Sequence, residues 1–258
     1  MKTYTYLNGS VKNGLLVRWT TNPLVVYIAP MKFYSKPGED AKYRKMVIDA
    51  LNTWAAASGG KISFRLTNVL MESHINVDWK RVERQALGNC YFQGDGQGRL
   101  GSAEVSIGLT DGRVHKQYDN EVEVYHTILH EIGHALGLGH SPYPQDIMYT
   151  PHQYGNASLS ANDKYSIQWL YRLPAGTPVQ AIASKYSMST SSDIDSVIRK
   201  IDSKRNQAEE KERMQIQTSR DLLQESTNIG DLNRYNMMLQ NISISQNVKN
   251  YLNNNRQS

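Results

Sequence analysis

The eleven residues from His130 to His140 constrain this chain more than any other feature, because they place three histidines at short, fixed spacings. They read HExxHxxGxxH, with Ser141 next and Met148 further on. Positions 130 and 134 lie one turn apart on the same face of an α-helix, so His130 and His134 can reach a common metal ion. Zinc prefers nitrogen and sulfur ligands in tetrahedral geometry, and a catalytic site keeps one position open. The third ligand, His140, must therefore come from beyond the helix end.

The glycines and the glutamate of this run predict how the ligand set is completed and used. Gly137 is expected to end the helix in a left-handed conformation, and Gly139 to keep the next turn loose enough to deliver His140. Glu131 points about 100° round the helix from His130, so it is a poor ligand and a good neighbour for the open position. There it can act as general base towards a metal-activated water. The run predicts one catalytic zinc, held by all three histidines, and hydrolysis of a peptide bond.

Two other interpretations of the helical histidines compete with this one. A histidine-bearing amphipathic helix would explain a bare HExxH, but the long form also contains Gly133, which costs about 1 kcal/mol relative to alanine in a helix interior. Folding alone does not require that residue. His126, His130 and His134 also share one helix face and could be counted as a metal-binding trio. Three helical ligands in line cannot surround one ion tetrahedrally, so the trio that ends in His140 is preferred.

The motif and the residues after it resemble the metzincin clan of zinc peptidases and, within it, the matrixins, over roughly residues 15–173. Ser141 after the third histidine is the matrixin choice. Residues 146–149 are similar to the Met-turn, which places a methionine, here Met148, beneath the metal. Residues 159–171 are similar to the closing helix of matrixin domains. The resemblance implies an α+β fold with a twisted mixed sheet, an active-site helix and a closing helix. It also implies a zinc-dependent endopeptidase that hydrolyses extended polypeptide.

The resemblance further implies where a polypeptide substrate binds. Residues 94–103 are similar to the matrixin glycine-rich loop and the edge strand after it, so extended substrate is expected to pair with the strand at 103–109. His126 is expected at the base of the pocket for the residue after the scissile bond, with Pro151 and Tyr154 as wall residues. There it would favour medium apolar or polar side chains over very long ones and could titrate near neutrality. A histidine merely packed in the helix is the alternative.

Three residues decide whether further cofactors or a thiol switch are expected. Ser102 stands where the resemblance leads one to expect a histidine of a second, structural zinc, so only the catalytic zinc is predicted. Asp95 with neighbouring carbonyls could help to bind calcium, and a glycine–aspartate turn is the favoured alternative. Cys90 is the only cysteine, which excludes an intramolecular disulfide. It lies outside the propeptide motif that silences matrixin zymogens, so a buried thiol is expected and regulatory contact with the metal is the alternative.

The patterning predicts an N-terminal extension at 1–14, a peptidase domain at 15–178 and a helical extension at 179–258. Apolar patterns predict strands at 24–28, 62–66, 75–79 and 103–109, and apolar spacing predicts a helix at 39–58. The active-site helix is expected at 120–137, and a third helix from Ser160, where Asp163 completes a variant capping box. After residue 179 amides and charged residues dominate, which predicts a helical hairpin with a break at 228–230. This tail is either a loose appendage or an element for docking or oligomerisation.

Composition limits the partners. The net charge of +5, from 29 basic and 24 acidic residues, is spread thinly and does not favour nucleic acid. No stretch has the length and apolarity of a membrane span, and the first residues lack the apolar core of a signal peptide. The chain is expected either to stay inside the cell or to begin after processing, whereas the family is mostly secreted. Two rival functions stay open: a non-catalytic binding module stabilised by zinc, and an interaction protein that acts through the tail.

Overall fold

The computed structural model describes residues 3–31, 38–81, 87–109, 120–225, 233–234 and 236–238. The chain consists of two compact units, Met1–Ile198 and Arg199–Ser258. The described part of the first unit combines a mixed sheet with helices, so the predicted α+β class is confirmed. The domain boundaries that the sequence suggests at residues 14 and 178 stay predictions.

The sheet of the first unit has the strand order β4-β3-β5-β7-β6 among the described residues. The strands are β3 (Leu24–Ile28), β4 (Phe64–Thr67), β5 (Ile75–Arg81), β6 (Gly88–Gly94) and β7 (Leu100–Leu109). All neighbouring pairs are parallel except β6 and β7, which pair antiparallel. In β5, buried Ile75, Val77 and Trp79 alternate with less buried polar residues, so one face of the sheet is turned towards the core.

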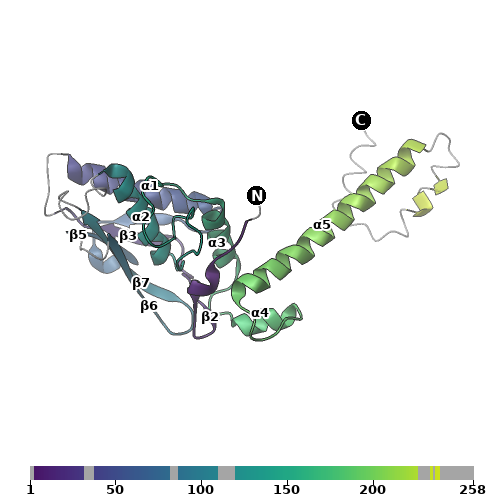
Figure 1. The fold of residues 1–258 in the computed structure, drawn as a ribbon, viewed down its shortest axis with the longest axis horizontal. Helices are drawn as coiled ribbons and strands as arrows, with labels where there is room; N and C mark the ends of the chain where they lie inside the picture. Colours follow the sequence, from purple (N-terminus) through teal and green to yellow (C-terminus); the bar gives the residue numbers. More distant parts are fainter. Residues whose placement is uncertain are drawn as a thin grey trace. The chain divides into compact units, whose positions relative to one another are not determined.

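Two long helices, α1 (Glu39–Ala57) and α2 (Glu121–Ala135), lie together on one face of the sheet (Figure 1). Buried apolar residues of α1 recur at helical spacing and include Val47, Leu51 and Trp54. The indole N–H of Trp54 donates to the carbonyl of Leu129 in α2 at 3.0 Å. The buried face of α1 therefore supports the helix that carries the first two histidines of the motif.

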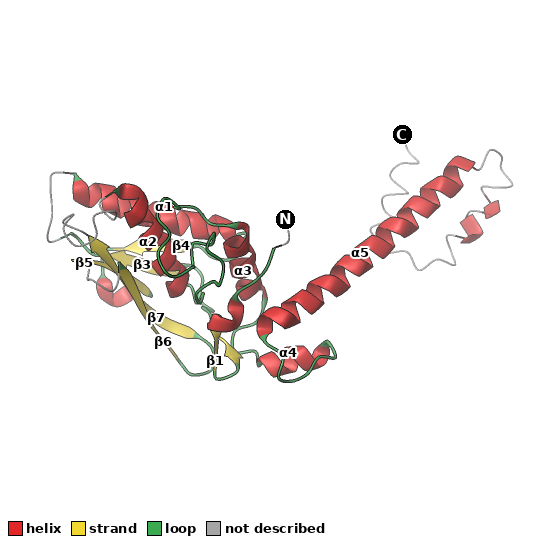
Figure 2. Cartoon of the chain, viewed as in Figure 1, coloured by secondary structure: helices red, strands yellow, loops and turns green. Residues whose placement is uncertain are grey.

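A long connection without helix or strand leads from α2 to α3 (Ala161–Arg172) (Figure 2). The side chain of Ser160 accepts the backbone N–H of Asp163, and the Asp163 carboxylate accepts the backbone N–H of Ser160. The predicted capping box is thus confirmed. Because the capping box fixes the first turn of α3, the side chains of that turn can anchor the connection that precedes the helix.

The structure corrects the predicted position of the sheet edge. The sequence places the edge strand at 103–109, and this is wrong because β5 pairs with one side of β7 and β6 with the other. The edge strand beside α2 is β6, in which half-buried Gly88, Cys90 and Phe92 alternate with exposed residues. The sequence pattern does not mark this segment as a strand, since glycine at both ends interrupts the alternation.

The N-terminal residues pack against the turn that follows α2. Gly9 lies in the 3-10 helix η1 (Leu7–Ser10), and its backbone touches that of Gly139. A Cβ on either glycine would lie within 2.8 Å of the Cα atom of the other. Gly139 is therefore needed for a close approach of two backbone segments. The sequence-based reason, a loose turn, is not the physical one.

The start of a C-terminal helix holds η1 in place. The carboxylate of Asp195 accepts the backbone N–H of Leu7 at 2.7 Å and that of Asn8 at 3.2 Å. The short strands β1 (Val11–Lys12) and β2 (Leu15–Leu16) form a hairpin after η1. Residues near both ends of the first unit are therefore joined by hydrogen bonds from backbone N–H groups to the Asp195 carboxylate.

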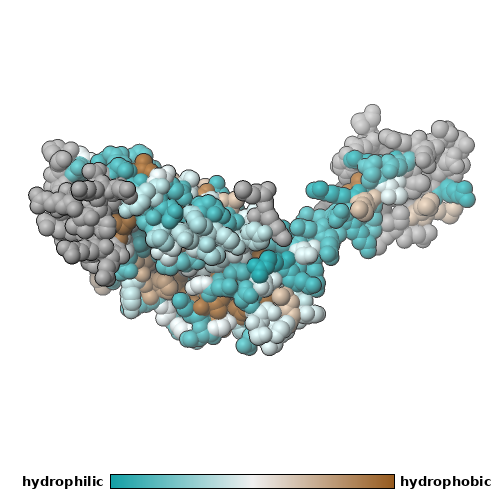
Figure 3. Space-filling model, viewed as in Figure 1, coloured by the Kyte–Doolittle hydropathy of each residue, from teal (hydrophilic) through white to brown (hydrophobic). Residues whose placement is uncertain are grey.

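The helical character predicted after residue 179 is found in α4 (Val179–Lys185) and α5 (Ile194–Glu225). Ile194, Val197 and Ile198 of α5 are buried, whereas most of its later residues are polar and exposed (Figure 3). The predicted break at 228–230 lies outside the described residues. Within the part of the chain that the structure describes, no helix is long and apolar enough to span a membrane.

Candidate active site

Three imidazoles meet at the end of α2. The Nε2 atom of His134 lies 3.1 Å from that of His130 and 3.1 Å from that of His140. One ligand atom from each histidine lies within 4.8 Å of those of the other two. A cluster of three imidazole nitrogens that leaves one side open is the donor set of a catalytic zinc site. The residues present therefore fit the zinc ion that the motif predicts.

Hydrogen bonds fix the tautomer of two ligands. The Nδ1–H of His130 donates to the carbonyl of Ile147 at 2.8 Å, and that of His134 to the carbonyl of Leu138 at 2.8 Å. The Nε2 atom of each ring is then unprotonated, and its lone pair faces the cluster. Burial, followed by the neighbouring His134, lowers the pKa of His130 to about 3. Burial lowers the pKa of His134 to about 4. Both imidazoles are therefore held in the neutral form that binds a metal.

Gly137 builds the turn that carries the third ligand. Its φ angle of 99° is left-handed, as the sequence predicts. Its N–H donates to the carbonyl of His134 at 2.8 Å, and the N–H of Leu138 donates to that of Gly133 at 3.0 Å. These two bonds form a Schellman motif, which ends a helix at a glycine. The same turn brings the Leu138 carbonyl to the Nδ1 atom of His134, so the helix end also orients a ligand.

Met148 is fully buried, with its sulfur beside Gly133 of α2. A Cβ at Gly133 would overlap the Met148 sulfur and would lie 3.0 Å from a ring carbon of Trp54. Gly133 is therefore required by packing between α2 and the Met-turn. The sequence-based statement that folding does not ask for this glycine is wrong, because the contact joins residues far apart in the chain.

Two buried carboxylates hold the Met-turn against α3. Asp146 accepts hydrogen bonds from the hydroxyls of Ser141 and Ser160. Asp163 accepts the backbone N–H of Ile147 at 2.9 Å. The carbonyl of the same Ile147 orients His130, so α3 contributes to the position of a predicted metal ligand. The sequence marks Asp163 only as a helix cap and does not reveal this second role.

Glu131 lies against the first residue of β6. Its side chain is buried, and its Oε2 atom has no hydrogen-bond partner among the described residues. A Cβ at Gly88 would lie 2.7 Å from Cγ and Oε1 of Glu131 and from Cγ2 of Thr127. Gly88 thus leaves the space that the carboxylate occupies. Burial raises the pKa of Glu131 to about 8. The positive charge of Lys80 opposes this effect, because it favours the charged form of the carboxylate.

Sequence reasoning does not find Gly88. The available signal is an isolated glycine at the start of an alternating run, which is typical of a close approach to a backbone. This signal does not say which element approaches. Only the register of β6 beside β7 places the glycine opposite Glu131.

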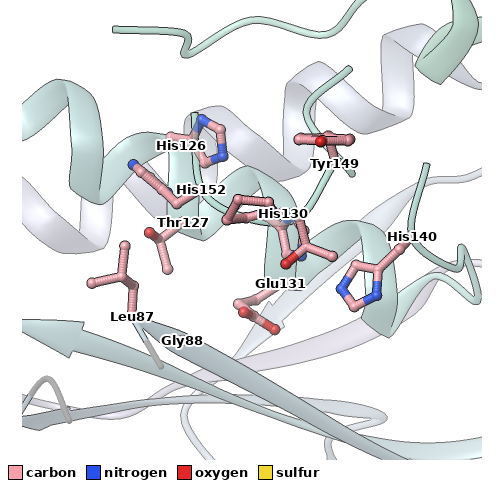
Figure 4. A pocket seen from close by; sticks show the side chains of 11 residues that line it. Leu87, Gly88, His126, Thr127, His130, Glu131, His140, Tyr149 and His152 are labelled. Carbon is pink, nitrogen blue, oxygen red and sulfur yellow. The ribbon is translucent and has the colours of Figure 1, made fainter. Parts of the chain in front are cut away.

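A cavity of about 290 Å³ opens beside the three histidines (Figure 4). It is lined by Leu87, Gly88, His126, Thr127, His130, Glu131, His140, Tyr149, Thr150, Pro151 and His152. Of the three predicted pocket residues, His126 and Pro151 line this cavity. Tyr154 is not among its lining residues, and its ring lies edge-on against that of His152 at 4.8 Å.

His126 is almost fully buried at this cavity. Its Nδ1–H donates to the carbonyl of Asn156, and its Nε2 atom has no partner among the described residues. Its ring centroid lies 4.1 Å from that of His152. Burial, followed by the charge of His152, lowers the pKa of His126 to about 4. The expected titration near neutrality is therefore wrong, because a buried imidazole beside a second one resists protonation.

Asp95 and Cys90, for which calcium binding and a regulatory thiol were the alternatives, both have contacts that explain them structurally. Asp95 accepts the backbone N–H groups of Gln97 at 2.8 Å and of Arg99 at 3.2 Å, and it pairs with the Arg99 side chain. This arrangement favours the turn over a calcium site. Cys90 lies in β6, where burial raises the pKa of its thiol to about 12. The thiol is therefore neutral, as expected of a partly buried cysteine.

These features together define a metzincin-type metallopeptidase domain. They are the mixed sheet, the helix with two of the three histidines, the third histidine after a glycine turn, and the buried methionine. The family model of the matrixins matches residues 18–172, which is more than half of the chain. The chain therefore belongs to the matrixin family.

Individual relatives agree with this assignment. Matrix metalloproteinase-2 of Drosophila melanogaster is 30% identical over 148 residues, which cover 51% of this chain and 18% of the fly protein. Stromelysin-3 of Xenopus laevis is 32% identical over 143 residues, or 52% of this chain and 28% of the frog protein. Matrilysin of Rattus norvegicus is 35% identical over 88 residues, or 33% of this chain and 31% of the rat protein. The matches thus span less than a third of these relatives' own length.

Proposed function

We propose that this chain is a zinc-dependent endopeptidase that hydrolyses peptide bonds of extended polypeptide, with Glu131 as general base. The observation that carries the proposal is the convergence of three histidine Nε2 atoms beside a buried carboxylate whose Oε2 atom has no hydrogen-bond partner among the described residues. Zinc, when bound there, supplies a Lewis acid that polarises the scissile carbonyl and acidifies water. Membership of the matrixin family supports the same activity.

The chain's own residues supply the remaining chemistry. His130, His134 and His140 would hold the metal, and their fixed tautomers keep the lone pairs turned inward. Glu131 takes a proton from the attacking water and later passes it to the leaving amine. Its place on α2, one residue after a ligand, brings the carboxylate close to the reacting atoms without making it a ligand. Gly88 keeps the space for that carboxylate open.

Substrate would pair with the free edge of β6, because the corresponding edge of β7 is already occupied. The side chain after the scissile bond would enter the cavity, where His126 forms the base and Pro151 lies on the wall. Because His126 would shorten the pocket, we expect medium apolar or polar side chains to be preferred over very long ones. Because burial holds the pKa of His126 at about 4, this preference should not change with its protonation near neutral pH.

Cleavage of a denatured protein, with and without a chelator, tests the proposal. We expect the chelator to abolish cleavage and added zinc to restore it. Glu131→Ala should keep its zinc and lose about 10²–10⁴-fold in turnover, because the general base is removed while the ligands remain. His134→Ala should lose the metal. Glu121→Ala, an exposed carboxylate on the same helix, is the matched control and should be as active as the wild type.

The cleavage assay, together with a measurement of partner binding, separates the two rival functions. A non-catalytic binding module would hold zinc and cleave nothing, with Glu131 or without it. An interaction protein that acts through the tail would keep its partner binding after Glu131→Ala and lose it when residues 199–258 are removed. Family membership also favours a secreted, extracellular site of action.

A further inference from the structure

One wall of the cavity is made by a loop with no regular secondary structure. Thr150, Pro151 and His152 line the cavity, and the loop continues through Gly155 and Asn156 before α3 begins. Such a segment lacks the regular backbone hydrogen bonds of a helix or strand, so contacts with neighbouring elements contribute strongly to its position. The contacts that hold it therefore decide the shape of the cavity.

Glu123, in the first turn of α2, makes two of these contacts. Its Oε2 atom lies 2.7 Å from Nε2 of His152, and its Oε1 atom accepts the backbone N–H of Gly155 at 2.9 Å. The side chain of Glu123 is only 5% exposed. A carboxylate is rarely buried this deeply unless it is paired, so this one is committed to the loop.

His126 makes a third contact one turn further along the same helix face. Its Nδ1–H donates to the carbonyl of Asn156, and its ring packs against that of His152. Residues 123 and 126 thus hold the loop at three successive points, a wall side chain and two backbone groups. Figure 4 shows His126 and His152 side by side at the edge of the cavity.

We propose that Glu123 is a positioning residue for substrate selectivity: it sets the width of the cavity by holding His152 and the Gly155 backbone against α2. The proposal rests on the proposed peptidase function, because it assigns selectivity to the same cavity. Glu123 does not line the cavity and does not touch the reacting atoms. It acts through His152, whose ring forms the wall.

The reason for expecting an effect on selectivity is geometric. Without the carboxylate, the Gly155 N–H and the His152 ring lose their acceptor, and the loop is free to move away from α2. A wider cavity discriminates less between side chains, and one methylene in a well-formed apolar pocket is worth about 10–200-fold. The metal ligands are held by other contacts, namely the carbonyls of Ile147 and Leu138. Zinc binding should therefore be unaffected.

The test compares zinc-loaded full-length variants on two peptides that differ only after the scissile bond, one with leucine and one with alanine there. We expect Glu123→Ala to lower the leucine-to-alanine ratio of kcat/KM by about tenfold, with unchanged zinc content. Glu123→Gln keeps one oxygen acceptor and should restore part of the ratio. Glu121→Gln changes an exposed carboxylate on the same helix and should leave the ratio unchanged.

Amide hydrogen exchange at residues 150–156 gives a second measurement that does not need activity. Faster exchange of the Gly155 amide in Glu123→Ala, together with the lower ratio, supports the proposal. An unchanged ratio overturns it, whether or not the Gly155 amide exchanges faster. If Glu123→Ala does not fold, Glu123→Gln and His152→Ala are compared with the wild type by the same criteria. If the wild type cleaves neither a denatured protein nor the two peptides, the proposed function fails, and hydrogen exchange alone then decides whether Glu123 holds the loop.

Discussion

Gly88→Ala is the substitution for which the structure gives the most definite expectation. The added Cβ would lie 2.7 Å from Cγ and Oε1 of Glu131 and equally close to Cγ2 of Thr127. Ordinary van der Waals contact begins at 3.4 Å, so the carboxylate or β6 must move by about 0.7 Å. Thr127 blocks one direction of that movement. Glu131, the proposed general base, is then displaced from its position beside the three histidines.

This displacement sets the magnitude of the effect. A misplacement of roughly 1 Å can cost about 10²-fold in rate, and complete loss of a general base about 10²–10⁴-fold. We therefore expect Gly88→Ala to lower kcat by about 10–100-fold, which is less than Glu131→Ala. Overpacking of this kind also costs about 1–3 kcal/mol of stability. Zinc content should stay the same, because the nearest atoms to the new Cβ belong to Glu131 and Thr127 and not to a ligand.

The assay measures kcat on one peptide together with bound zinc and the unfolding temperature. Gly101→Ala is the control, since Gly101 lies in β7 and a Cβ there would meet only the Gln93 carbonyl, at 3.9 Å. A Gly88→Ala enzyme with the kcat of the wild type would refute the placement of Glu131 against β6. So would a Gly101→Ala enzyme that is equally impaired, because the effect would then belong to the sheet in general.

The remaining predictions concern packing, the third ligand and pH. Gly133→Ala should lower the unfolding temperature, because overlap with the Met148 sulfur costs about 1–3 kcal/mol and exceeds the gain of about 1 kcal/mol in helix propensity; a more stable variant contradicts this. Asp195→Ala should speed the transfer of zinc to a chelator, and an unchanged rate counts against the role given to η1. The pKa of His126 is lowered to about 4, so the neutral form stabilises the fold above the unfolded-state pKa of about 6.5 and that stability is lost as pH falls towards 4. His126→Leu should show a smaller loss of stability over this range, while the cleavage preference of the wild type stays constant from about pH 5.5 to 8.

Local features of this chain could be predicted from the sequence, because neighbouring residues determine them. The left-handed turn at Gly137 and the capping box of Ser160 follow from the conformations that these residue types favour. The helix that carries His130 and His134 follows from apolar periodicity. Each of these features depends on fewer than about twenty consecutive residues, the range over which sequence patterns are informative.

Features that depend on pairing between distant segments could not be predicted. The resemblance to the matrixins predicts the edge strand at residues 103–109, whereas the edge beside α2 is β6, which begins and ends in glycine. The reason for Gly133 lies in Met148 and Trp54, and the width of the cavity depends on Glu123, which has no recognisable motif. The sequence predicts that His126 titrates near neutrality, because it does not reveal the burial of this residue beside His152. That burial is a property of the fold and lowers the pKa.

The third ligand differs from the first two in what holds it. His130 and His134 have helical backbones, whereas His140 lies in a turn and is the most exposed of the three. That turn is confined by Gly9, which touches Gly139, and Gly9 belongs to η1, which Asp195 holds from 188 positions away in the sequence. A disturbance at Asp195 should therefore reach His140 before it reaches the helical pair. The contacts that confine the third predicted ligand thus extend to the first turn of α5, where composition alone suggests a separate tail.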